Sequence, residues 1–148
     1  MDGKYWIVLA SILGAMSVGL GAYHAHGLKA KLESDLPQPT DVAEQPDWRV
    51  AIDKRLHNCE VGVRYQMFNA LALLVIGGLS LNFPSRLINV AGGLLLLGVG
   101  SFSGGLYLHA FTGNIGHFAI IPSGGLLQII GWIVLAVAAF GLPQASRN

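Results

Sequence analysis

Four long apolar runs constrain this chain more than any other feature of its sequence. They cover residues 5–23, 65–81, 87–110 and 122–142, and none of them contains an aspartate or a glutamate. A membrane-spanning helix needs about 20 consecutive apolar residues, because each residue adds about 1.5 Å and the hydrocarbon layer is about 30 Å thick. We therefore expect four transmembrane helices.

The composition supports a single membrane domain. Charged residues make up only 11% of the 148 residues, whereas a soluble domain has roughly 25%. The net charge of +1 leaves no basic stripe for a nucleic acid, and the single cysteine, Cys59, excludes an intrachain disulfide. We expect one domain over residues 1–148, in a multi-pass protein of a bacterial inner membrane, with lipids and no nucleic acid as partners.

The connections between the runs predict how the helices are arranged. Those after the second and third runs are short, so we expect an all-α, antiparallel four-helix bundle. The first connection, residues 24–64, is long. Its three prolines between residues 36 and 46 predict an irregular linker. The apolar spacing from Ile52 to Val63 predicts an amphipathic helix that lies at the interface or leads straight into the second span.

The basic residues predict the orientation in the membrane. More of them lie in the long connection than near the termini, which places the connection in the cytoplasm and both termini outside. The connection contains Lys29, Lys31, Arg49, Lys54 and Arg55, against Lys4, Arg86 and Arg147 on the other side.

Small residues line one face of several predicted helices. In a bilayer, helices associate by close packing, so such faces mark contacts. Gly93 extends the face of the third span, and Ser11 and Ala15 share a face of the first. These faces favour a tight bundle, or one that also self-associates. The candidate packing glycines are Gly19, Gly100, Gly104, Gly124 and Gly131.

Polar residues around the start of the second span are candidates for binding a lipid headgroup. An arginine at the mouth of a span must pair or reach the interface, so Arg64 either anchors the helix beside Glu60 or holds a lipid phosphate. Buried amides are expected to form hydrogen bonds between helices, with a ligand cavity as the alternative; Gln128 belongs to this group. The headgroup candidates are His24, His26, Lys29, Arg64, Tyr65, Gln66 and Asn69.

Histidines raise the question of a metal or haem site. His109 and His117 flank the third connection, and would have to face one cavity to bind haem. A copper or zinc site could draw on four residues, but residues two apart on a helix point in nearly opposite directions and the spacing is not that of a closed site. We expect no metal and no cofactor. The four weak metal candidates are His24, His26, His57 and Cys59.

Four segments resemble those of a known family. They read AHGLKAKL after the first span, VRYQMFNALALL opening the second, FSGGLYL in the third and IPSGGLLQIIGW in the fourth. In this order, and over nearly the whole chain, they resemble the YgdD/YwdK-type small membrane proteins, a bacterial family of unknown function with a mitochondrial relative. The family pattern has a histidine where this chain has Asn69. The resemblance implies four membrane helices and no particular activity.

The sequence leaves two classes of function. A coupled transporter needs an ionisable residue in mid-membrane, and a nucleophilic enzyme needs a base beside a serine or cysteine; neither is evident, so we expect no enzyme. The first class is a structural or accessory membrane component, either a homo-oligomer or a small subunit of a larger complex. The second is a protein that binds lipid, metal or haem in the region of Arg64, His24 and His26.

Overall fold

A computed structural model describes residues 1–114 and 119–142 of the chain. The described residues form helices and no strand. Four helical stretches are long and apolar enough to cross a membrane, which confirms the all-α fold with four spans. In chain order the elements are α1 (Gly3–Tyr23), a π-helical turn η1 (His24–Leu28), α2 (Lys29–Asp35), α3 (Gln45–Asn82), α4 (Arg86–Thr112) and α5 (Ile120–Phe140).

Local sequence signals explain where the helices begin and end. The Asp2 carboxylate accepts a hydrogen bond from the Lys4 backbone N–H at 3.3 Å and so caps α1. Pro46 lies in the first turn of α3, where a missing N–H has no consequence, and Pro84 follows the end of α3. Gly113 ends α4 with φ 75°, a left-handed conformation that glycine adopts without strain.

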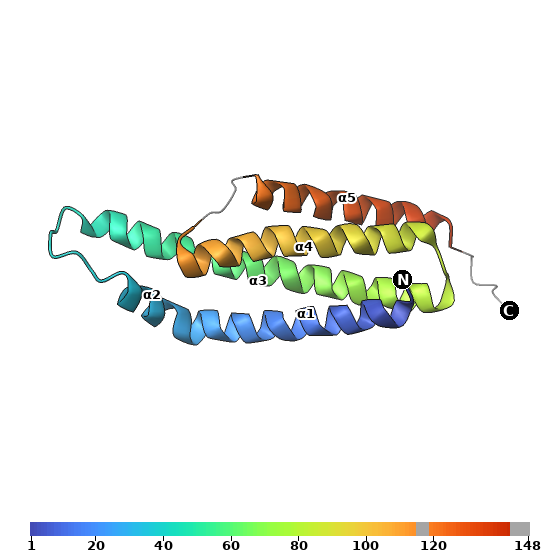
Figure 1. The fold of residues 1–148 in the computed structure, drawn as a ribbon, viewed down its shortest axis with the longest axis horizontal. Coiled ribbons are helices and arrows are strands. Elements are labelled where there is room, and N and C mark those ends of the chain that lie inside the picture. The colour runs from blue at the N-terminus through green and yellow to red at the C-terminus, as the bar shows by residue number, and fades with distance from the viewer. Residues whose placement is uncertain (115–118, 143–148) are drawn as a thin grey trace.

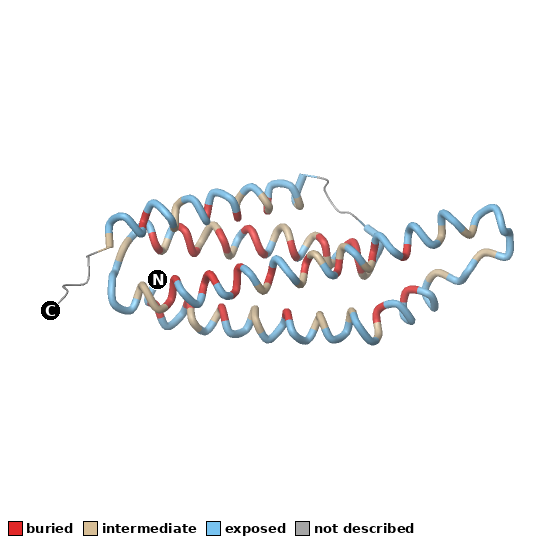
Figure 2. Tube along the Cα trace, turned by 180° about the vertical axis from the view of Figure 1, so that it is seen from behind, coloured by how far each residue is buried: buried red, intermediate tan, exposed pale blue. Residues whose placement is uncertain are grey.

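The four spans pack in chain order across the molecule. α1 packs on α3, α3 on α4 and α4 on α5, each antiparallel to the next, and α1 and α5 lie on opposite sides of the central pair (Figure 1). Buried residues therefore concentrate on α3 and α4, as Figure 2 shows. At one end, Trp6 of α1 also reaches α4, where its indole N–H donates to Asn89 Oδ1 at 2.8 Å.

α1 ends at Tyr23, where the predicted first span also ends, but the helical path does not stop there. The chain continues through η1 into α2, so that residues 3–35 form one helical stretch. The physical reason is that no proline occurs before Pro37, while the lysines, alanine, leucine and glutamate of α2 favour a helix. The irregular part of the connection is limited to residues 36–44.

The length of α3 decides between the two alternatives for the amphipathic segment, which was expected either to lie at the interface or to lead straight into the second span. Its 38 residues extend about 57 Å, nearly twice the thickness of the hydrocarbon layer. The amphipathic segment thus leads straight into the second span. Together with η1 and α2 it forms a projecting hairpin, residues 24–56, which extends beyond the ends of α4 and α5 (Figure 1).

The projecting hairpin has its own small core. Leu28 and Leu32 are buried against Ile52 of α3, and Cys59 and Ala110 close this cluster at the base of the hairpin. The Trp48 indole N–H also donates to the Leu36 carbonyl at 2.6 Å. Apolar burial and a hydrogen bond between the two arms hold the hairpin together, so it is a continuous extension of the bundle.

Candidate functional site

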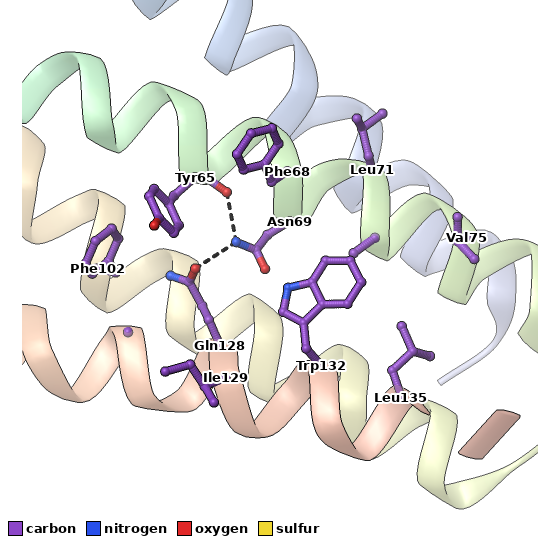
Figure 3. A pocket seen from close by; sticks show the side chains of 12 residues that line it. Tyr65, Phe68, Asn69, Leu71, Val75, Phe102, Gln128, Ile129, Trp132 and Leu135 are labelled. Atoms are coloured by element: carbon purple, nitrogen blue, oxygen red, sulfur yellow. Dashed lines mark hydrogen bonds between the residues drawn. The ribbon is translucent and has the colours of Figure 1, made fainter. Parts of the chain in front are cut away.

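A groove of about 640 Å³ lies between α3 and α5 (Figure 3). Its walls are mainly apolar and aromatic. Exposed side chains such as Phe68 and Trp132 form its rim, so it opens toward the surrounding bilayer and not toward the interior of the bundle. The residues that define it chemically are Tyr65, Phe68 and Asn69 of α3, Phe102 of α4, and Gln128 and Trp132 of α5.

Two amide side chains at the bottom of the groove join three helices. Asn69 Nδ2 donates to Gln128 Oε1 at 2.8 Å and to the Tyr65 carbonyl, also at 2.8 Å. Gln128 Nε2 in turn donates to the Gly98 carbonyl of α4 at 3.1 Å. Gln66 makes a separate link, from its Nε2 to the Leu13 carbonyl of α1 at 2.8 Å. The amides therefore form the interhelical hydrogen bonds that the sequence predicts.

One atom of this network has no partner. Asn69 is 1% exposed, and its Oδ1 accepts no hydrogen bond from any described residue. Figure 3 shows this oxygen on the side of Asn69 that faces the Trp132 indole. A buried acceptor without a donor costs about 1–3 kcal/mol. The groove thus combines an apolar wall with one unsatisfied polar atom.

The sequence offers a ligand cavity at the buried amides only as the alternative and does not predict the aromatic wall of this groove, although a signal for that wall exists. Tyr65, Phe68, Ala72 and Val75 recur at the helical spacing of three and four residues. That spacing indicates a common face of α3, but it does not distinguish a lipid-facing groove from a packed core. Only the position of α5 beside this face makes it a groove.

The predicted headgroup residues do not form one site. Tyr65 and Asn69 line the groove, whereas Gln66 is used for packing against α1. Arg64 is half-exposed and pairs with Glu60, one turn earlier, as an interfacial anchor would. The remaining three belong to the first helical stretch: His24 and His26 lie in η1, and Lys29 pairs with Glu33 at 3.9 Å.

The structure does not bring the weak metal candidates together. Among residues 1–114 and 119–142, no three His, Cys, Asp or Glu side chains are placed to hold one metal ion. His57 is exposed, whereas Cys59, two residues later, is buried. His117, which the haem hypothesis requires, lies outside the described residues.

A buried polar cluster at the C-terminal end of α4 was not predicted. Arg55 is 8% exposed, and its Nε–H donates to the Ala110 carbonyl at 2.9 Å. His109 is buried beside it, with its Nδ1 at 2.7 Å from Asn58 Nδ2. A cation at the carbonyl end of a helix meets a favourable dipole. The signal in the sequence was the position of Arg55 between Ile52 and Cys59 on the buried face of α3.

The candidate packing glycines divide into two groups. A Cβ on Gly124 would collide with the backbone of Phe102, and one on Gly131 would lie 2.8 Å from Leu95 Cδ2, so both pack α5 against α4. A Cβ on Gly19, Gly100 or Gly104 would meet nothing within 4 Å. These last three are therefore not packing positions within one chain, because α1 and α4 use other faces for their neighbours.

Four apolar helices joined in sequence, with amide links between them, define an α-helical multi-pass membrane protein. The chain belongs to the family described as "Protein of unknown function (DUF423)", which matches residues 20–125. This confirms the resemblance found in the sequence. No solved structure matches the chain.

Two relatives illustrate the similarity. "UPF0382 membrane protein SH2409" from Staphylococcus haemolyticus is 40% identical, over 93% of this chain and 96% of that protein. "UPF0382 membrane protein YwdK" from Bacillus subtilis is 35% identical, over 92% of this chain and 96% of its own length. Both names agree with the membrane location that the four spans indicate, and neither states an activity.

Proposed function

We propose that the protein is a non-enzymatic, structural component of the membrane that associates laterally with further copies of itself. The observation that carries this proposal is the open face of α4. Gly93, Gly100 and Gly104 share that face, and a Cβ on any of them would meet nothing within 4 Å. Leu97, between them, is 63% exposed.

Glycines on an open helix face favour association in a bilayer. In a bilayer, apolar surface alone does not drive helices to associate, because lipid tails are equally apolar. Small residues do favour association, because they let two backbones approach closely. A glycine inside a helix costs about 0.8–1.0 kcal/mol relative to alanine. Gly100 and Gly104 carry this cost with no contact inside the chain to offset it. A contact with another chain would supply the compensating packing.

A two-fold dimer through α4 is the simplest assembly. An isologous contact needs only one self-complementary face, and Gly100 and Gly104 lie four residues apart, as in the pairing motif of membrane helices. Ser11, Ala15 and Gly19 form a second exposed face on α1. That face is available for a further contact, either with a third copy or with a different subunit of a larger complex.

Replacing both glycines by isoleucine tests the proposal. A Cβ on Gly100 or Gly104 meets nothing within 4 Å, so Gly100→Ile with Gly104→Ile should keep the helical fold of the monomer, with an unfolding midpoint that is unchanged or slightly higher. At an interface the added side chains cost about 1–3 kcal/mol, which weakens association by roughly fivefold to hundredfold. Photobleaching step counts of labelled protein in bilayers, over a range of protein-to-lipid ratios, measure this.

Gly78→Ile provides the matched control. Gly78 lies on α3, away from the proposed interface, and a Cβ there also meets nothing within 4 Å. This control should associate like the unmodified protein. A protein that stays monomeric at every ratio contradicts the proposal, and so does a double variant that associates as well as the control.

A further inference from the structure

The apolar groove between α3 and α5 continues along the spans. A second hollow of about 310 Å³ shares Val75, Trp132 and Leu135 with it and extends to Leu79. From Tyr65 to Leu79 the axis of α3 rises about 21 Å, some two thirds of the hydrocarbon thickness. The combined groove is therefore long enough for an extended hydrocarbon chain lying parallel to the helices.

One end of this groove carries a hydrogen-bond acceptor and a hydrogen-bond donor that both lack partners among the described residues. Asn69 Oδ1 is a buried acceptor without a donor. The indole N–H of Trp132 is a donor, and no described residue accepts from it. A hydroxyl group both donates and accepts hydrogen bonds. Both residues line the same groove, and a hydroxyl that reached both of them would satisfy both.

The depth and the charge of this end restrict the head of a ligand. Gln128, which binds Asn69, lies eight residues inside α5 from Ile120, about 12 Å along the helix. Among residues 1–114 and 119–142, no Asp, Glu, Lys, Arg or His lines either hollow. A phosphate or ammonium group at this depth would be unpaired in hydrocarbon, at a cost of several kcal/mol. The head of the ligand must therefore be small and neutral.

Aromatic side chains cover the polar end of the groove on the side of the membrane–water interface. The rings of Tyr65 and Phe102 lie 5.0 Å apart between centroids, and those of Tyr65 and Phe68 lie 6.2 Å apart. Figure 3 shows these three rings beside the Asn69–Gln128 pair, with Trp132 beyond it. They shield the amides from the headgroup layer, so a hydroxyl would reach Asn69 from the bilayer side.

We propose that this groove binds a neutral membrane lipid that carries a hydroxyl group at the head of an apolar chain. The hydroxyl donates to Asn69 Oδ1 and accepts from the Trp132 indole, while the chain lies along Val75 and Leu79. The same chemistry occurs in glycerol-based lipids such as diacylglycerol and in ring-bearing isoprenoid lipids such as quinols. The site is independent of the proposed self-association, because Phe102 points from α4 nearly opposite to Gly100 and Gly104.

Native mass spectrometry with a matched pair of probes tests the hydroxyl. Oleyl alcohol and its methyl ether have the same chain and the same acceptor oxygen, but in the ether a methyl group replaces the donating hydrogen. Titrated into detergent micelles of the full chain, the alcohol should be retained between about threefold and tenfold better than the ether, the effect of one neutral hydrogen bond. Equal retention of the two probes by the unmodified protein overturns the proposal.

Three variants assign the effect to the groove. Asn69→Leu removes the acceptor and should abolish the preference for the alcohol, but it also breaks the hydrogen bond to Gln128. Trp132→Phe therefore serves as a second variant. It leaves the amide network intact and should reduce the same preference. In Gly125→Val the Cβ would lie at an ordinary 3.6 Å from Phe102, and the two further methyl groups narrow the groove, so this variant should weaken the binding of both probes together.

Leu126→Ala is the control, since this exposed residue of α5 lies outside the groove and its replacement should change nothing. An undiminished preference in both Asn69→Leu and Trp132→Phe overturns the proposal.

Lipids that co-purify with the protein distinguish the two natural sources. A mass of a glycerol-based neutral lipid or of a ring-bearing isoprenoid lipid that Trp132→Phe depletes supports the proposal and names the source. A mass of phospholipid alone, unaffected by the variants, contradicts the neutral head. The Gly100 and Gly104 double variant should keep its preference for the alcohol, so failure of either proposal is recognised separately.

Discussion

Arg55 and Arg64 both belong to α3 and lie in opposite environments. Arg55 is buried, and its charge meets the carbonyl end of α4 through Ala110. Arg64 is half-exposed, and the partner it has among the described residues is Glu60 on its own helix. In the sequence, Arg64 is a candidate site residue because it stands at the mouth of a span. In the structure, it is Arg55 that contacts another helix, because the end of α4 lies beside it.

This difference predicts unequal effects on stability. Arg55→Met keeps an apolar stem but removes a hydrogen bond from a charged donor, so we expect the free energy of unfolding to fall by about 1.5–3 kcal/mol. Arg64→Met removes one exposed ion pair and should change it by less than about 0.5 kcal/mol. Unfolding curves in micelles at equal detergent concentration measure both. Similar midpoints for the two variants would refute this ranking.

At the scale of elements, the contact between α4 and α5 depends on glycines in both helices. Gly124 faces the backbone of Phe102, and Gly98 of α4 faces Gly124 and Gln128 in return. The two helices approach so closely at this level that the Gln128 amide can reach the Gly98 carbonyl. The close approach of the two backbones therefore also makes possible the hydrogen bond between α5 and α4 at the bottom of the groove.

Alanine substitutions should separate packed from open glycines. In Gly124→Ala the new methyl group meets backbone, which cannot rotate away, so we expect a loss of about 1–3 kcal/mol. Gly78→Ala meets nothing within 4 Å, and should be neutral or gain up to about 1 kcal/mol from helix propensity. Thermal unfolding followed by circular dichroism reports both, and a destabilised Gly78→Ala would show that this face is occupied.

At the scale of the whole molecule, the projecting hairpin defines two unlike sides. The hairpin carries the linker and most of the charged residues, whereas the opposite end has only Lys4 and Arg86 as described basic residues. The excess of basic residues predicts that the hairpin lies in the cytoplasm.

Cysteine labelling can measure this orientation. The native Cys59 is buried, so it gives little background. Thr40→Cys, at the exposed tip, should react with a membrane-impermeant maleimide only in inside-out vesicles, and Asp2→Cys only in intact cells or right-side-out vesicles. Both sites are exposed, so accessibility within the protein does not limit the reaction. The reverse pattern would mean that the hairpin faces outward.

The sequence predicts the number of spans well, because a hydrocarbon layer of fixed thickness demands long apolar runs. It predicts the interior poorly. In lipid, the outer and inner faces of a helix are equally apolar, so the pattern could not distinguish the open Gly104 from the packed Gly124. The aromatic wall of the groove was missed for the same reason: Tyr65 and Phe68 are aromatic on either interpretation, and only α5 makes them a wall.

The packing of each span on the one before it also bears on biogenesis. α3 can dock on α1, α4 on α3 and α5 on α4 in the order in which the ribosome delivers them, and no early helix has to wait for a late one. Contacts close in sequence also form quickly. Synthesis alone can therefore build the molecule outward, one helix at a time, with α5 and its share of the groove added last.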